Sequence, residues 1–162
     1  SEIHGMAQRG GSVISQVRFG ADVASPIIQE GTSDILVSFD KLEALRWSHL
    51  LSEEGVALVN DLYLVPVTVS SGQQAAVENL DERVHQAFRK SVFVDAMKVA
   101  TEEVGNARTM NMVLAGALSA LTPFDEKLWH QAMKEMLTGP KARLLEVNEK
   151  AFALGRKAAM QD

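Results

Sequence analysis

The sequence predicts an α/β fold: a three-layer, mostly parallel, Rossmann-like sheet with an antiparallel N-terminal hairpin and a helical C-terminal part. Three observations lead to this prediction. Predominantly apolar runs at residues 35–39, 56–60 and 91–96 are typical of strands buried on both faces. A helical pattern separates the first two runs, which makes a βαβ unit. From residue 98 onward the apolar spacing is helical.

The hairpin is predicted ahead of these strands. Residues 13–19 alternate apolar and polar side chains and are rich in β-branched residues, which indicates a strand of about seven residues. A turn at 20–22 and a short second strand at 23–28 complete the antiparallel pair. Because Pro26 has no N–H to donate to a ladder, the second strand either lies at a sheet edge or ends there.

Helices and one extended segment are predicted between the buried strands. Asp40 follows the first apolar run and is a suitable N-cap for a helix over 41–51. Residues 62–69 are β-branched and predicted to be extended. Asn79, with Glu82 three residues later, predicts a capping box at the start of a helix that leads up to the third strand.

The C-terminal part is predicted to be helical throughout. Residues 98–121 form a helical region that is interrupted at 105–106, and Gly116 within it allows close packing on a neighbouring element. Thr-Pro at 122–123 is suited to the N-cap and first position of the next helix. Gly-Pro at 139–140 then starts a last amphipathic helix.

Length and composition narrow the function classes. A chain of 162 residues corresponds to a single domain, residues 1–162. The net charge of −5 and the absence of any basic run argue against nucleic-acid binding, and no uncharged apolar window is long enough to span a membrane. The sequence has no cysteine, which excludes disulfides and thiolate-bound zinc or iron–sulfur clusters and favours a reducing, cytoplasmic location.

The strongest candidate site is the predicted glycine loop, residues 8–12, which directly precedes the first predicted strand. Gly10 and Gly11 allow a ligand to approach the peptide groups closely. Arg9 can hold a phosphate or carboxylate with two hydrogen bonds, and Gln8 can bind an amide or carbonyl. Two alternatives stay open: the segment, including Ser12, is simply a tight turn, or Arg9 pairs with a local acid.

A second candidate site lies where the helix from Met110 begins. Asn106 and Asn111 bracket this start, and Asn106 either caps the helix or faces a ligand in the adjoining crevice. Met110 and Met112 are core residues in the simplest reading. The four histidines have no spacing typical of a metal site, and no serine has a nucleophile elbow, so neither a metal ligand nor a catalytic residue is assigned.

One segment also carries a family resemblance. Residues 4–20 read HGMAQRGGSVISQVRFG and resemble the opening loop and strand of the gamma domain of 2-oxoacid:ferredoxin oxidoreductases, above all in the small (beta) subunits of the indolepyruvate type. The MxQRGGS motif is the most specific part. The resemblance continues in order along the chain, through SPII at 25–28, DILVSFD at 34–40, LEAL at 42–45, GN at 105–106 and NMVLAGAL at 111–118.

The resemblance implies a pyruvate/ketoisovalerate oxidoreductase gamma-type domain. Domains of this family open with a glycine-rich βα unit, and this sequence, which has no G-x-G-x-x-G, is expected to be N-terminally incomplete relative to them. The implied function is that of the non-cluster subunit of an indolepyruvate- or arylpyruvate-type 2-oxoacid:ferredoxin oxidoreductase. Thiamine diphosphate and the iron–sulfur clusters would lie on a large partner subunit, and ferredoxin would take electrons from the complex.

The resemblance implies that this chain helps to form the part of the active site that binds coenzyme A. The isolated chain is expected to be inactive. The residues expected to bind are Gln8, Arg9, Gly10, Gly11, Ser12, Asn106 and Asn111. The alternative function is a non-enzymatic assembly module of the same fold that binds a nucleotide, coenzyme A or an acyl carrier. In addition, a sheet edge left uncovered by the missing βα unit predicts that the isolated chain forms homo-oligomers.

Overall fold

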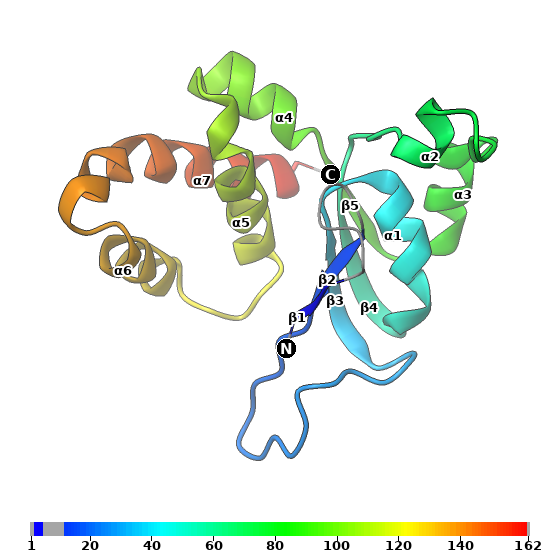
Figure 1. The fold of residues 1–162 in the computed structure, drawn as a ribbon. Coiled ribbons are helices and arrows are strands. Elements are labelled where there is room, and N and C mark those ends of the chain that lie inside the picture. The colour runs from blue at the N-terminus through cyan, green and yellow to red at the C-terminus, as the bar shows by residue number, and fades with distance from the viewer. Residues whose placement is uncertain (1, 5–11, 162) are drawn as a thin grey trace. The chain divides into compact units, whose positions relative to one another are not determined.

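A computed structural model describes residues 2–4 and 12–161 of the chain (Figure 1). The chain divides into two compact units. The first comprises Ser1–Ala57 and Tyr63–Lys90, and the second comprises Leu58–Leu62 and Ser91–Asp162. The boundary between them falls within strand β4 (Leu51–Asn60).

Three strands form the central parallel sheet. Strands β3 (Ser33–Ser38), β4 and β5 (Ser91–Val94) are arranged in the order β3-β4-β5. This confirms the α/β class and the positions of the three predicted strands. Only the second half of β4 is largely buried, however, and the edge strands β3 and β5 are partly exposed. Because β4 is the middle strand, its last four residues, 57–60, are all fully buried. Residues 52–54 near its start are polar and partly or fully exposed, which is why the apolar run marked only the second half.

The antiparallel hairpin is present, but its pairing differs from the prediction. Strand β1 (Glu2–His4) pairs with β2 (Val13–Ser15), with Ile3 opposite Ile14. The predicted strand over 13–19 is therefore only three residues long.

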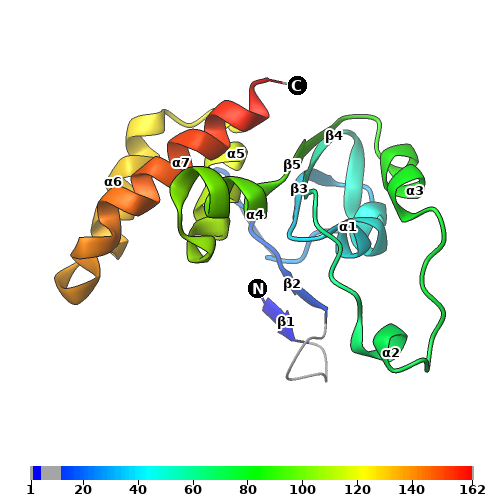
Figure 2. The same ribbon diagram turned by 90° about the horizontal axis from the view of Figure 1, so that it is seen from above.

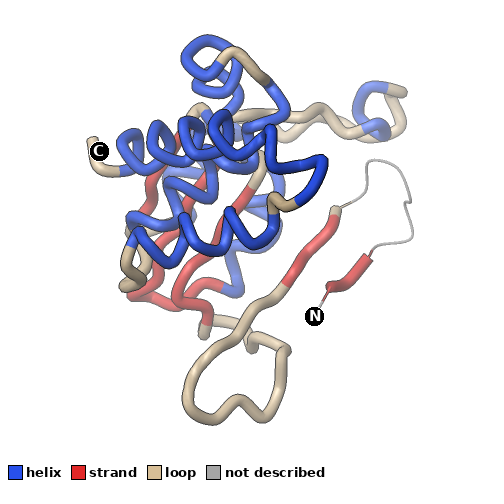
Figure 3. Tube along the Cα trace, turned by 90° about the vertical axis from the view of Figure 1, so that its left-hand side faces the viewer, coloured by secondary structure: helices blue, strands red, loops and turns tan. Residues whose placement is uncertain are grey.

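The predicted strand at 23–28 is wrong, because this segment has no strand structure (Figure 3). Hydrogen bonds between the side chains of Gln16 and Arg18 and the backbone of this segment replace the strand–strand hydrogen bonds that were predicted. The Gln16 side-chain carbonyl accepts a hydrogen bond from the backbone N–H of Ile28 at 2.8 Å. The Arg18 guanidinium donates to the carbonyl oxygens of Ser25 and Ile27 at 3.0 and 3.2 Å.

Helix α1 (Lys41–Trp47) begins where predicted and continues through a 3-10 turn, η1 (Ser48–Leu50). Its N-cap is Asp40, whose carboxylate accepts hydrogen bonds from the backbone N–H groups of the first turn. Helix α3 (Leu80–Ala87) packs against α1. A 2.6 Å ion pair between Lys41 and Asp81 joins the two helices.

Two details between β4 and α3 correct the sequence predictions. Residues 62–69 are not extended throughout, because Pro66 initiates one helical turn, α2 (Val67–Ser70). The predicted capping box is also wrong. Asn79 adopts a left-handed conformation, with φ of 52°, and its side chain makes no capping hydrogen bond.

The second unit contains the helical C-terminal part (Figure 2). Its elements after β5 are α4 (Ala96–Lys98), the π-helical segment η2 (Val99–Val104), η3 (Ala107–Thr109), α5 (Met110–Ala120), α6 (Glu126–Met136), η4 (Gly139–Leu144) and α7 (Leu145–Ala159). The predicted interruption at 105–106 is confirmed, since Gly105 ends η2 with φ of 84°. Helix α6 begins later than the Thr-Pro pair predicted, because Asp125 caps it.

The core of the second unit is the contact between α5 and α7 (Figure 2). Gly116 of α5 lies against the backbone of Phe152, and a Cβ added at 116 would stand 1.9 Å from the Phe152 carbonyl oxygen. Gly155 of α7 lies against Val113 in the same way, since a Cβ added at 155 would stand 1.8 Å from the Val113 carbonyl oxygen. The two backbones therefore touch directly, which confirms the packing role predicted for Gly116.

Candidate functional site

The seven predicted site residues fall into three groups. Gln8, Arg9, Gly10 and Gly11 lie outside the described residues. Ser12 belongs to the first unit, and Asn106 and Asn111 belong to the second. Of the predicted glycine loop, residues 8–12, the structure therefore describes only the last residue, Ser12.

Ser12 is held by the side of helix α1. Its hydroxyl donates a hydrogen bond to one carboxylate oxygen of Glu43. The indole N–H of Trp47 donates to the Ser12 hydroxyl and to the same Glu43 oxygen, at 3.1 Å in each case. Glu43 and Trp47 lie on one face of α1 because residues four apart in a helix are neighbours. We name these three residues, Ser12, Glu43 and Trp47, the loop anchor.

The end of strand β3 fixes the helix that carries the loop anchor. Asp40 follows β3 and accepts hydrogen bonds from the backbone N–H groups of Leu42 and Glu43 at 2.8 and 3.0 Å. Burial raises the pKa of the Asp40 carboxyl above its ordinary value, and these two N–H groups offset part of that effect. Ligands of open α/β sheets bind beyond the carboxyl ends of the strands. The first turn of α1, with Glu43, lies at such an end.

The second unit has its own polar junction at the end of β4. Asn60 is fully buried, and its side-chain carbonyl accepts a hydrogen bond from the backbone N–H of Ala96 at 3.0 Å. Its amide nitrogen faces the sulfur of Met110 at 3.6 Å. Asn60 thus connects the end of β4 with the first residues of α4 and α5. The sequence analysis did not predict this role. The one sign of it in the sequence is an asparagine at the end of an apolar run that is predicted to be buried.

Asn106 is a capping residue of the short helix that precedes α5. Its side-chain oxygen accepts a hydrogen bond from the backbone N–H of Arg108 at 3.1 Å. Its own carbonyl oxygen accepts from the hydroxyl of Thr109 at 2.7 Å. Asn111, in the first turn of α5, is exposed. A ligand-binding role for either asparagine stays a prediction.

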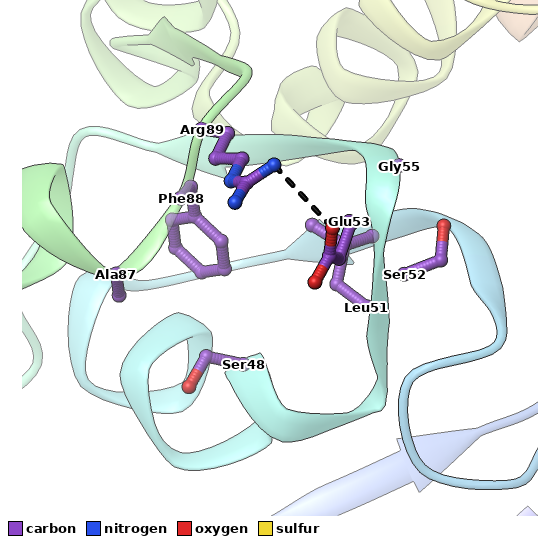
Figure 4. A pocket seen from close by; sticks show the side chains of 8 residues that line it. All are labelled: Ser48, Leu51, Ser52, Glu53, Gly55, Ala87, Phe88 and Arg89. Carbon is purple, nitrogen blue, oxygen red and sulfur yellow. Dashed lines mark hydrogen bonds and ion pairs between the residues drawn. The ribbon is translucent and has the colours of Figure 1, made fainter.

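A pocket of about 200 Å³ lies in the first unit, at the beginning of β4 and the end of α3 (Figure 4). Its lining residues are Ser48, Leu51, Ser52, Glu53, Gly55, Ala87, Phe88 and Arg89. The guanidinium of Arg89 and the carboxylate of Glu53 approach to 3.4 Å above it. This end of β4 is opposite to the carboxyl end at which α/β sheets bind ligands, so we assign the pocket no ligand.

Within the described part of the chain, residues 2–4 and 12–161, no group of three histidine or acidic residues could hold a metal ion. His130 has carboxylates near both ring nitrogens, Glu126 at 3.4 Å and Glu149 at 3.5 Å. Because they face different nitrogens, they do not converge on one point. None of the helices within these residues is long and apolar enough to cross a membrane.

Sequence comparison relates the whole chain to one enzyme family. The family model of pyruvate ferredoxin/flavodoxin oxidoreductase matches residues 1–158. Indolepyruvate oxidoreductase subunit IorB of Pyrococcus horikoshii is 41% identical over 99% of this chain and 80% of its own length. The same subunit of Thermococcus kodakarensis has the same identity and coverage, and that of Archaeoglobus fulgidus is 32% identical over 99% of this chain and 79% of its own.

Solved structures share the fold. The gamma subunit of a keto/oxoacid ferredoxin oxidoreductase from Geobacter sulfurreducens superposes with a TM-score of 0.63 at 23% identity, covering all of this chain and 79% of its own. Subunit PORC of pyruvate oxidoreductase from Thermotoga maritima has a TM-score of 0.56 at 20% identity, over 78% of this chain and 64% of its own. These two comparisons confirm the fold class that the sequence predicts.

Proposed function

This chain belongs to the pyruvate ferredoxin/flavodoxin oxidoreductase family and is a subunit of an oxidoreductase, and we propose that it is the small, non-cluster subunit of an indolepyruvate-type enzyme. The observation that carries the proposal is the 41% identity to indolepyruvate oxidoreductase subunits over 99% of the chain. The proposed complex oxidises an arylpyruvate, releases CO₂ and transfers the acyl group to coenzyme A. Family membership favours this function over that of a non-enzymatic binding module.

The composition indicates which subunit of the proposed complex holds the iron–sulfur clusters. Iron–sulfur clusters are held mainly by cysteine thiolates, and this sequence has no cysteine. The clusters are therefore assigned to a large partner subunit, through which electrons reach ferredoxin. Thiamine diphosphate is proposed to lie on the same partner subunit. The complex is expected to work in the cytoplasm.

The chain's own proposed task is to bind the anionic part of coenzyme A. Arginine forms paired hydrogen bonds to phosphate, and consecutive backbone N–H groups beside glycines add further donors. Arg9, Gly10 and Gly11 supply these groups in the glycine loop, and Gln8 supplies an amide. The loop's last residue, Ser12, is fixed to α1, whose first turn lies at the carboxyl end of β3. A ligand-binding role for Asn106 and Asn111 is a separate prediction from the sequence.

Reconstitution tests the function. The chain is co-expressed with its thiamine- and cluster-bearing subunit, and oxidation of indolepyruvate is followed with coenzyme A and ferredoxin. We expect turnover by the complex, and neither turnover nor visible iron–sulfur absorbance from the isolated chain. Turnover by the isolated chain, or full activity of the large subunit without it, would contradict the proposal.

A further inference from the structure

The chain between β2 and β3 contains a loop, residues 16–28, that is closed by its own side chains (Figure 3). Gln16 and Ile28, which are 12 residues apart in sequence, are joined by the 2.8 Å hydrogen bond from the Ile28 backbone N–H to the Gln16 side-chain carbonyl. Arg18 donates to two carbonyl oxygens on the returning half of the loop. Surface loops whose ends are close and which are held by their own side chains are frequently functional. We name residues 16–28 the closed loop.

The first half of the closed loop has an inverted amphipathic pattern. The polar side chains of Gln16 and Arg18 bond to the returning half of the loop, whereas the apolar side chains of Val17 and Phe19 are 75% and 69% exposed. On the returning half, Ile27 is 59% exposed. In a hairpin with one face in water the reverse is usual, with the apolar side chains on the core and the polar ones outside. This loop is therefore held together by polar side chains and presents apolar ones.

The exposed apolar surface of the closed loop is large for so short a segment. Val17, Phe19 and Ile27, together with Val23 at 40% exposure, present roughly 400 Å² of apolar side chain. A specific protein–protein interface takes about 800 Å² from each partner. The closed loop alone therefore supplies about half of one side of such an interface.

The shape and the charge of the closed loop favour a different subunit over a second copy of this chain as its partner. The loop projects beyond β3, so its surface is convex (Figures 1 and 3). Two convex loops touch over a small area, whereas a groove in another protein encloses both sides of one loop. Residues 16–28 include two charged residues, Arg18, which bonds within the loop, and Asp22, so the matching groove is apolar. This chain is a subunit of an oxidoreductase and therefore has partner subunits.

We propose that the closed loop is the element by which this chain docks into an apolar groove of its large partner subunit, with Val17 and Phe19 as the anchoring side chains. The inference rests on the proposed function for the identity of that partner, and it adds a surface to which that function assigns no role. The hydrogen bonds within the loop hold these side chains in place before binding, which reduces the conformational entropy lost on association.

The test measures the affinity of this chain for the separately purified large subunit, at concentrations where sedimentation shows the chain to be monomeric. The double variant Val17→Ser/Phe19→Ser should bind roughly ten- to a hundredfold more weakly, the usual loss when apolar anchors of an interface are removed. The matched control is Val67→Ser on α2, a valine of the same unit that is 68% exposed, and it should bind like the wild type. Because all three side chains are exposed, neither variant should change the melting temperature.

A fluorescent label shows whether the closed loop is covered in the complex. The sequence has no cysteine, so Asp22→Cys introduces a single thiol, which is labelled with a polarity-sensitive dye before the large subunit is added. The dye emission should shift to shorter wavelength when the complex forms, and the same dye on Val67→Cys should not respond. This readout leaves Val17 and Phe19 intact, so it decides the question if the double variant melts at a lower temperature than the wild type.

The outcomes distinguish this inference from the proposed function. If the wild-type chain does not bind the large subunit, the proposed function fails together with the inference. If the wild type binds and the double variant binds equally well, or if the dye at residue 22 does not respond, the inference is overturned while the function stands. It is also overturned if Val67→Ser loses as much affinity as the double variant, or if the double variant loses only self-association, since the partner of the loop is then a second copy.

Discussion

Gly116→Ala is the substitution whose effect the structure defines most sharply. The added Cβ would lie 1.9 Å from the Phe152 carbonyl oxygen, and real Cβ atoms essentially never approach closer than 3.0 Å. By subtraction, 3.0 − 1.9, the backbone of α7 would have to move by at least 1.1 Å. Phe152 is fully buried, and a close-packed core does not absorb such a shift freely.

Two effects of opposite sign act on the unfolding free energy of Gly116→Ala. Replacing glycine by alanine in a helix gains about 1 kcal/mol of helix propensity. Overpacking a core costs about 1–3 kcal/mol and more where backbone must move. Because the added Cβ clashes with backbone atoms, we expect the cost of overpacking to exceed the gain in helix propensity. The unfolding free energy should therefore fall by about 2 kcal/mol. For a chain of this size that corresponds to a melting temperature lower by roughly 4–8 °C.

Urea unfolding and thermal melting followed by far-ultraviolet circular dichroism measure this change. The matched control is Gly20→Ala, where an added Cβ would meet only the Val23 side chain, at an ordinary contact distance of 3.9 Å. The control should melt like the wild type. If Gly116→Ala is as stable as the wild type, or more stable, then propensity outweighs packing and the direct backbone contact of α5 and α7 is refuted.

Three further predictions concern other parts of the chain. Burial raises the Asp40 pKa, so the folded state binds this proton more tightly than the unfolded chain, and the contribution of Asp40 to the unfolding free energy should fall as pH rises from the ordinary value of 3.8 through the raised pKa. In urea titrations across pH, the wild type should therefore lose stability relative to Asp40→Asn, which keeps the helix cap, and an unchanged difference between the two would contradict this. Asn60→Leu leaves the buried N–H of Ala96 without its partner and should lower the unfolding free energy by about 1–3 kcal/mol, whereas an unchanged urea midpoint would refute the junction at the end of β4. The isolated chain should self-associate with rising concentration in sedimentation velocity, and replacing the exposed Val17 and Phe19 by serine should reduce this; a strictly monomeric wild type would contradict it.

The parts of the fold that sequence predicted are those set by local chemistry. Apolar runs marked β3, β4 and β5 because the strands of a parallel sheet covered by helices are mainly apolar, even where, as in β3 and β5, they are partly exposed. The Asp40 cap was predictable because its acceptor serves N–H groups only two and three residues away. Gly116 was predictable as a packing position because glycine has few other uses inside an apolar helix.

The parts that sequence missed depend on distant partners. The alternating pattern of residues 13–19 could not show that β2 pairs backward with β1, since residues 23–28 offered an equally near strand. In the candidate site, the ligand-binding role of Ser12 stays a prediction, and what the sequence did not show is that its hydroxyl bonds to Glu43 and Trp47 of α1. Glu43 and Trp47 are separated from it by more than thirty residues, so spacing along the chain gave no sign of the contact.

The most direct test of the proposed role of this chain is the coenzyme A affinity of the reconstituted complex carrying Arg9→Ala. Loss of a charge-assisted bond to a phosphate corresponds to roughly 1.5–3 kcal/mol, so we expect affinity to fall about ten- to a hundredfold at an unchanged melting temperature. Arg9→Lys should recover part of it, because a point charge cannot form the paired contact. Arg83→Ala, the loss of an exposed arginine on α3, is the matched control and should bind normally. An affinity unchanged in Arg9→Ala would contradict the assignment of the glycine loop to coenzyme A.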